Sequence, residues 1–130
     1  HRLFNHRQSW VGANYPMRAG PPFEFTALAL DKRRVFTGPE SAGLEECLYT
    51  GFGVTLMDID VFSKVPQPWF EMPWLGEGNY GTSDCYLARK VNEAGMHIYV
   101  DHDVSKQTGH VGLHIFNCAE VAHWKAANGK

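Results

Sequence analysis

Short apolar and alternating runs along the chain predict several β-strands. The clearest is residues 23–30, where apolar residues alternate with others before the run becomes fully apolar, as is typical of a strand with buried faces. The other expected extended segments are residues 7–14, 45–50, 54–57, 97–101 and 104–110. Glycines and prolines between these runs indicate turns.

A helix is predicted over residues 82–94. Ser83 is a suitable N-cap, Asp84 fits the first turn, and Gly95 is a typical helix stop. The helix has one apolar face, made by Leu87, Ala88, Val91 and Ala94. Shorter helical segments are expected at residues 61–65 and 113–126.

The segment 66–81 is rich in proline, glycine and aromatic residues, which argues against regular structure and predicts a long loop. Trp74 and the other aromatic side chains of this loop have flat faces that pack against sugar rings. Aromatic side chains also anchor loops to an ordinary core. Both readings remain open here.

The order of these elements predicts an α/β fold in which a helix packs on a mixed sheet. With 130 residues and no visible linker or repeat, residues 1–130 are expected to form a single domain.

Composition and charge exclude some classes of function. The net charge is -2, and Lys32-Arg33-Arg34 is too short to form a basic patch, so no nucleic-acid partner is expected. No apolar run reaches the roughly 18 residues that a membrane span needs. The three cysteines are far apart, which fits reduced thiols and a cytoplasmic protein.

Asp84 is the first candidate for chemistry. A carboxylate at a helix N-terminus lies in the positive end of the helix dipole, which favours its charged form. A positioned carboxylate of this kind suits a general base that takes a proton from a hydroxyl group. The alternative is that Asp84 only stabilises the start of its helix.

His110 and a pair of glycines are further candidates. His110 lies between Gly109 and Gly112, where a neutral imidazole can bind a divalent metal or simply form a hydrogen bond at a strand end. Gly51 and Gly53 leave space for a sugar ring or a phosphate, although such a pair also marks a β-bulge.

The segment Asp58-Ile59-Asp60 has the form of a D-x-D metal motif. It falls where a strand ends and a helical turn begins, so Asp60 is expected to act as a helix cap rather than as a metal ligand.

The order of these motifs resembles that of GT-A glycosyltransferases of the family 2 type, over about residues 46–114. The residues that carry the resemblance are Gly51-Phe52-Gly53, Pro68-Trp69-Phe70, Ser83-Asp84, Asn92-Glu93-Ala94-Gly95, Ile98-Tyr99-Val100-Asp101 and Gly109-His110-Val111-Gly112. Polypeptide N-acetylgalactosaminyltransferases are relatives within this group.

The resemblance implies roles for single residues. Asp84 matches the catalytic aspartate of inverting members, and Ser83 stands where the family usually has a glutamate. His110 matches the histidine that completes the metal site, while Gly51 and Gly53 match the loop that shapes the sugar site. In retaining members no base is needed, so Asp84 would there orient the acceptor.

The implied reaction is attack of an acceptor hydroxyl on the anomeric carbon of a nucleotide-sugar, with Mn2+ or Mg2+ neutralising the leaving diphosphate. The acceptor would be a glycan or a protein. By this resemblance residues 1–130 are the C-terminal, acceptor-side portion of the domain, without the nucleotide-binding half. We therefore expect the isolated chain to be inactive, and its uncovered surface to favour self-association.

Two other functions fit the residues. One is a carbohydrate- or protein-binding module that uses the aromatic loop 66–81, including Trp74. The other is a histidine-rich metal hydrolase with His97, His102 and His110 as ligands.

Overall fold

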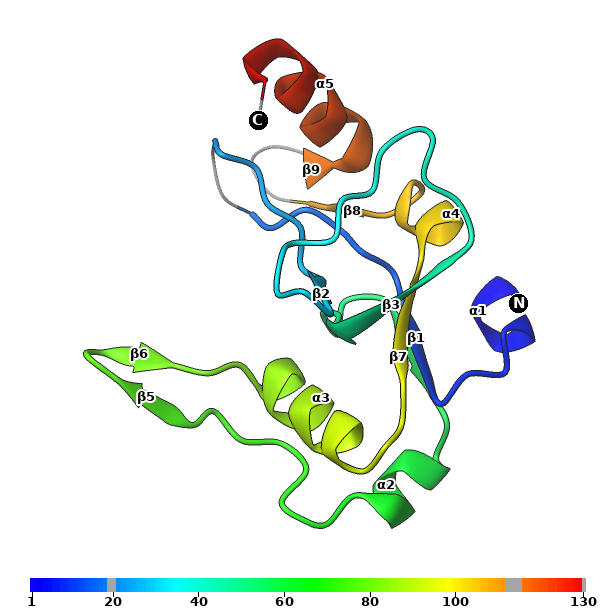
Figure 1. The fold of residues 1–130 in the computed structure, drawn as a ribbon, viewed down its shortest axis with the longest axis vertical. Helices are drawn as coiled ribbons and strands as arrows, with labels where there is room; N and C mark the ends of the chain where they lie inside the picture. Colours follow the sequence, from blue (N-terminus) through cyan, green and yellow to red (C-terminus); the bar gives the residue numbers. More distant parts are fainter. Residues whose placement is uncertain (19–20, 112–115, 130) are drawn as a thin grey trace.

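The computed structural model describes residues 1–18, 21–111 and 116–129 (Figure 1). Its helices are α1 (Arg2–Asn5), α2 (Asp60–Lys64), α3 (Ser83–Glu93), α4 (His102–Ser105) and α5 (Cys118–Asn128). Its strands are β1 (Trp10–Gly12), β2 (Leu28–Ala29), β3 (Leu44–Tyr49), β4 (Thr55–Met57), β5 (Trp74–Gly76), β6 (Asn79–Tyr80), β7 (Ile98–Asp101), β8 (Gly109–His110) and β9 (Phe116–Asn117).

The described part of the chain contains a central sheet with strand order β2-β3-β7-β1-β4. β1 runs parallel to β7, with Val11 opposite Tyr99, and every other neighbouring pair is antiparallel. The predicted α/β class, with a mixed sheet and a packed helix, is confirmed. Among the described residues, no helix has both the length and the apolar character that crossing a membrane requires.

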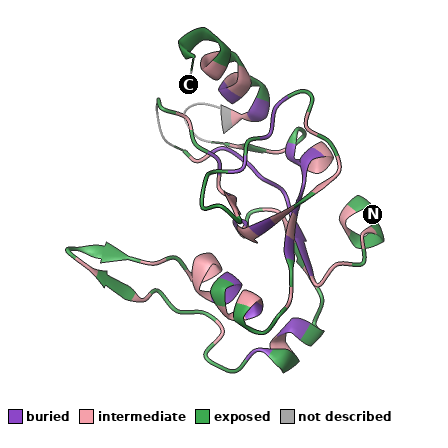
Figure 2. Cartoon of the chain, in the orientation of Figure 1, coloured by how far each residue is buried: buried purple, intermediate pink, exposed green. Residues whose placement is uncertain are grey.

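The core forms where α3 packs against the sheet. Leu87, Ala88 and Val91 of α3 are buried, as their helical spacing predicts. They belong to one buried cluster with Trp10 and Ile98 of the sheet. Figure 2 shows this buried centre, in purple, along the strands and on the inner side of α3. The core therefore fixes the position of the helix that begins with Ser83 and Asp84.

The segment 66–81 is more regular than expected, because its end forms the β5–β6 hairpin. Trp74 lies opposite Tyr80, and the connecting residues Gly76, Glu77 and Gly78 all have positive φ angles. Two glycines supply that backbone conformation without strain, which allows a tight turn. The hairpin projects from the body of the molecule (Figure 1), and most of it is exposed (Figure 2).

Residues 104–110 were expected to be extended, but the first part of this segment belongs to α4. The reason is Asp101, whose Oδ1 accepts hydrogen bonds from the backbone N–H groups of Asp103 and Val104. An aspartate in this position caps a helix and satisfies two of its free N–H groups. Only Gly109 and His110 then form a strand, β8.

Other boundaries also differ from the sequence expectations. In the segment 23–30 only Leu28–Ala29 forms a strand, together with an isolated bridge between Phe25 and Pro16. Of the helix expected at 113–126, residues 113–115 lie outside the described residues, and α5 begins at Cys118.

Candidate functional site

Asp84 occupies the second position of α3, directly after the hairpin. The backbone N–H of Gly81 bonds to the carbonyl of Pro73 at 2.8 Å and closes the base of the hairpin two residues before the helix. Asp84 Oδ1 accepts the N–H of Cys85 at 2.9 Å. The N-cap is Thr82 rather than the expected Ser83, and its side chain makes no capping bond. Ser83 is the first residue of the helix itself.

Gly51 and Gly53 lie against the phenol of Tyr15. The Tyr15 hydroxyl accepts a hydrogen bond from the N–H of Gly53 at 2.7 Å. A Cβ atom added at Gly53 would lie 2.6 Å from this hydroxyl oxygen, and one added at Gly51 would also collide with it. The space that the two glycines leave open is therefore filled by Tyr15.

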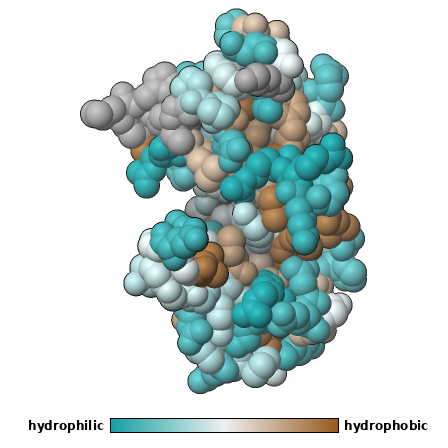
Figure 3. Space-filling view, turned by 60° about the vertical axis from the view of Figure 1, so that its left-hand side comes forward, coloured by the Kyte–Doolittle hydropathy of each residue, from teal (hydrophilic) through white to brown (hydrophobic). Residues whose placement is uncertain are grey.

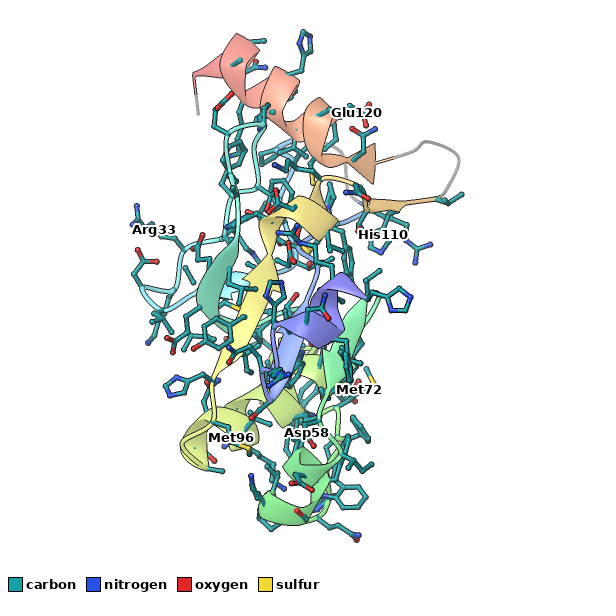
Figure 4. All side chains as sticks on the ribbon, turned by 90° about the vertical axis from the view of Figure 1, so that its right-hand side faces the viewer. Arg33, Asp58, Met72, Met96, His110 and Glu120 are labelled. Atoms are coloured by element: carbon teal, nitrogen blue, oxygen red, sulfur yellow. The ribbon has the colours of Figure 1, made fainter. Side chains whose placement is uncertain are left out.

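His110 lies on β8, between α5 and the central sheet (Figure 4). Its ring is packed edge-on against the Tyr15 ring, with 4.6 Å between the ring centroids. His110 Nδ1 is buried and has no hydrogen-bond partner among the described residues. An unpaired polar atom in a half-buried ring is costly unless a ligand or water completes it.

Tyr15 is thus the side chain that connects the predicted site residues. It contacts His110 through its ring and Gly53 through its hydroxyl. Burial raises the pKa of the Tyr15 phenol above its ordinary value; the Gly53 bond opposes this rise, and the negative charge of Asp84 adds to it. The glycine pair and His110 therefore both lie against one phenol ring.

Sequence reasoning missed Tyr15. The residue follows β1 in a segment without regular structure, and no local pattern distinguishes it from other tyrosines. Its partners are 38 and 95 positions away along the chain for Gly53 and His110 respectively. Only the folded chain brings them together.

The molecular surface is hollowed between the hairpin and the upper part of the molecule (Figure 3). The aromatic residues of 66–81 take two different roles. Trp69 is an anchor, because its Nε1 donates to the carbonyl of Val65 at 2.8 Å and its ring packs against Phe62. Trp74 and Tyr80 form an edge-to-face pair on the exposed hairpin.

Asp58 and Asp60 do not form a metal motif with His110. Asp58 Oδ1 accepts the N–H of Asp60 at 2.9 Å at the start of α2. Asp60 is the first residue of α2, whose N-cap is Ile59, so Asp60 is not the cap that the sequence suggested. Figure 4 shows Asp58 beside α2, well separated from His110.

The three histidines of the hydrolase hypothesis do not share a site. The exposed His97 pairs with Glu46 at 2.7 Å, whereas His110 packs on Tyr15. His102 is buried, with Nδ1 2.9 Å from Thr37 Oγ1 and Nε2 2.9 Å from Glu45 Oε2. The prediction of a His97, His102 and His110 metal centre is therefore wrong.

The hydrogen-bonded series Glu45–His102–Thr37 has the acid, histidine, hydroxyl order of a catalytic triad. The burial of Thr37 excludes that role. Thr37 is fully buried, and its Oγ1 also accepts a bond from Asn14 Nδ2 at 3.1 Å. A nucleophile must reach its substrate, so this network is structural. It satisfies polar groups that the core would otherwise leave unpaired.

The fit of a divalent metal can be judged from the donor set. Mn2+ and Mg2+ prefer several oxygen ligands. Among residues 1–18, 21–111 and 116–129, no group of three or more His, Cys, Asp or Glu side chains could hold an ion. His110 offers one nitrogen. The described residues therefore do not make a complete metal site.

Comparisons with known protein families, with curated proteins and with solved structures found no match. The residues around Tyr15 are therefore the basis on which a function can be proposed.

The close fit of the glycines to Tyr15 leads to a testable prediction. Gly51→Ala and Gly53→Ala should each lower the free energy of unfolding by about 1–3 kcal/mol through overpacking. Tyr15→Phe removes the oxygen that a Cβ at Gly51 would strike. It leaves Cζ at 2.7 Å from a Cβ at Gly53. The cost of Gly51→Ala should thus fall by roughly 1 kcal/mol in the Tyr15→Phe background, and that of Gly53→Ala should stay nearly unchanged.

Urea unfolding of the two double-mutant cycles measures this difference. The Gly53 cycle is the matched control, since both cycles share the loss of the Tyr15 hydroxyl. Equal coupling energies at the two glycines would contradict the described packing.

Proposed function

We propose that residues 1–130 form the acceptor-side part of a GT-A glycosyltransferase domain of the family 2 type. In this proposal an acceptor hydroxyl attacks the anomeric carbon of a nucleotide-sugar, and the bond from that carbon to the diphosphate breaks. Asp84 accepts the proton of the hydroxyl in an inverting reaction, or orients the hydroxyl in a retaining one.

The observation that carries the proposal is that the Gly51–Gly53 segment and His110 both contact Tyr15, whose pKa is raised by burial and, to a smaller extent, by the charge of Asp84. The glycine segment, His110 and Asp84 come from distant parts of the chain, and the resemblance assigns each of them to one sugar-transfer site. The mixed sheet with α3 packed on it also supports the proposal, because the core holds in place the helix that begins with Ser83 and Asp84.

Asp84 is well positioned for either role. It lies in the first turn of an 11-residue helix, whose dipole stabilises a negative side chain. It also comes soon after the β5–β6 hairpin along the chain. We assign His110 as a candidate for a single metal ligand and assign no step to a metal, because the described residues do not complete a metal site.

A second candidate function is favoured by the exposure of the hairpin. Met72, Trp74, Leu75 and Tyr80 are all large apolar side chains that are more than half exposed. Exposed apolar groups that lie together often mark a binding surface. The hairpin would then bind a carbohydrate or a protein without chemistry.

One titration separates the two functions. Isotope-labelled protein is titrated with neutral monosaccharides and observed by NMR, in the wild type and in Asp84→Asn and Trp74→Ala. The glycosyltransferase proposal expects shifts at Ser83, Asp84 and Gly53, with affinity lowered about tenfold by Asp84→Asn through loss of a charged hydrogen bond. Shifts confined to the hairpin, lost in Trp74→Ala and insensitive to Asp84→Asn, would favour the binding module.

The isolated chain is expected to show no turnover of nucleotide-sugars in the presence of Mn2+, because the proposal places the donor-binding residues outside residues 1–130. Product formation is followed by release of the nucleoside diphosphate. Clear transfer or hydrolysis, absent from Asp84→Asn, would show that this chain holds a complete site.

A further inference from the structure

Tyr15 is held rigidly at the centre of the proposed site. It is only 6% exposed. Its backbone is fixed on both sides: the N–H of Thr26 donates to the Tyr15 carbonyl at 3.0 Å, and the Tyr15 N–H donates to Thr26 Oγ1 at 3.4 Å. The phenol ring cannot move away without breaking its contact with His110.

The hydroxyl of Tyr15 makes only one of the two kinds of hydrogen bond that it can form. A phenol has one proton to donate and can also accept a hydrogen bond. The Tyr15 oxygen accepts from Gly53, but among the described residues no group accepts its proton. Buried tyrosine hydroxyls normally find such a partner. Tyr15 therefore presents a fixed, unpaired donor.

The surroundings of this donor define the ligand that suits it. His110 supplies a second buried polar atom without a partner, Nδ1. The negative charge of Asp84 adds to the rise that burial causes in the pKa of the Tyr15 phenol. An anionic oxygen would be repelled by Asp84, whereas a neutral hydroxyl group can accept from Tyr15 and donate to a nitrogen or a carboxylate.

We infer that Tyr15 is a ligand-binding residue of this site, which donates its phenolic hydrogen to a hydroxyl oxygen of a bound sugar while its ring positions His110. The inference rests on the proposed function for the identity of the site, and it adds a residue that the resemblance does not assign. It also gives the Gly51–Gly53 segment a purpose, because only glycines leave room for the phenol.

The test extends the titration to Tyr15→Phe, with Tyr49→Phe as the matched control. Tyr49 is a half-buried tyrosine whose hydroxyl is already bonded to Arg34 Nη1 at 2.8 Å. The full 130-residue chain is titrated with glucose, galactose, mannose and their N-acetylamino forms, and in parallel with inorganic pyrophosphate. The signals followed are the Gly53 amide, the His110 ring and, in the wild type, Tyr15 Cζ.

A neutral sugar is expected to shift all three signals in the wild type. Tyr15→Phe should weaken binding about three- to tenfold, the loss of one neutral hydrogen bond, and Tyr49→Phe should leave it unchanged. In Tyr15→Phe the His110 ring signals should keep their wild-type positions, because the ring contact remains. If Tyr15→Phe does not fold, the response of Tyr15 Cζ in the wild type decides the question.

Several results would overturn the inference: no response to any sugar at Tyr15 Cζ and Gly53, equal affinity in Tyr15→Phe and wild type, or a response to pyrophosphate alone. A response that depends on Tyr15 but not on Asp84 would keep the inference and remove the glycosyltransferase proposal. A response that depends on Asp84 but not on Tyr15 would keep the glycosyltransferase proposal and overturn the inference about Tyr15.

Discussion

Replacing Trp10 by alanine is expected to lower the free energy of unfolding by about 3–5 kcal/mol, the usual cost of deleting a large aromatic side chain from a core. Trp10 is 0% exposed, lies in the main buried cluster and stacks on Phe52 with 5.6 Å between ring centroids. It also lies on β1, between β7 and β4, so the cavity would open at the centre of the sheet. This loss is a large share of a typical domain's stability.

Trp74→Ala is the matched control, because it removes the same side chain from the exposed hairpin. Trp74 is 57% exposed and contacts Tyr80 rather than the core, so little change in stability is expected. Urea unfolding followed by circular dichroism measures both variants. A similar loss for the two tryptophans would contradict the burial described here. Trp10→Phe should cost less than Trp10→Ala, since it keeps most of the volume.

Replacing Asp101 by alanine is expected to cost about 3 kcal/mol, from the loss of hydrogen bonds to charged groups and of a helix cap. The Asp101 carboxylate is completely buried and accepts bonds from Arg2 Nε at 2.6 Å and from the backbone of α4. It also lies 2.7 Å from His6 Nε2. One side chain thus joins α1, β7 and α4. Thermal unfolding should shift downward by roughly 10 °C.

Asp31→Ala is the control for Asp101. Asp31 also pairs with an arginine, Arg33, but in an exposed turn, where such pairs contribute little. A loss as large as that of Asp101→Ala would show that burial and the α4 cap are not the reason for the effect.

Lowering the pH should remove the stability that the Asp101 carboxylate contributes. Burial works to raise the pKa of Asp101, but the bonds from His6, the α4 backbone and Arg2 outweigh it, so the pKa lies below its ordinary value. The stabilisation is therefore present above the unfolded pKa of about 3.9 and is lost as the pH falls through the lower folded value. The wild type should lose stability below about pH 4, and Asp101→Asn should show a smaller pH dependence there.

Much of the local structure follows from the sequence. The helix Ser83–Glu93 was predictable because Leu87, Ala88 and Val91 repeat at helical spacing and Gly95 follows. The strand Ile98–Asp101 is a short apolar run that pairs on both sides. The helix α4 was missed because a short capped turn depends on one side chain, Asp101, rather than on a periodic pattern.

The sequence by itself determined the α/β class and the main helix, and it predicted Gly51, Gly53, Asp84 and His110 as candidate site residues. Only the tertiary structure decided how they meet. Tyr15 lies beside Gly53 and His110 because β1 is an interior strand between β7 and β4, and that position arises from pairing between strands distant along the chain. Local propensity does not predict such contacts, because they join residues that are distant in sequence and stabilise the fold only when the core has formed.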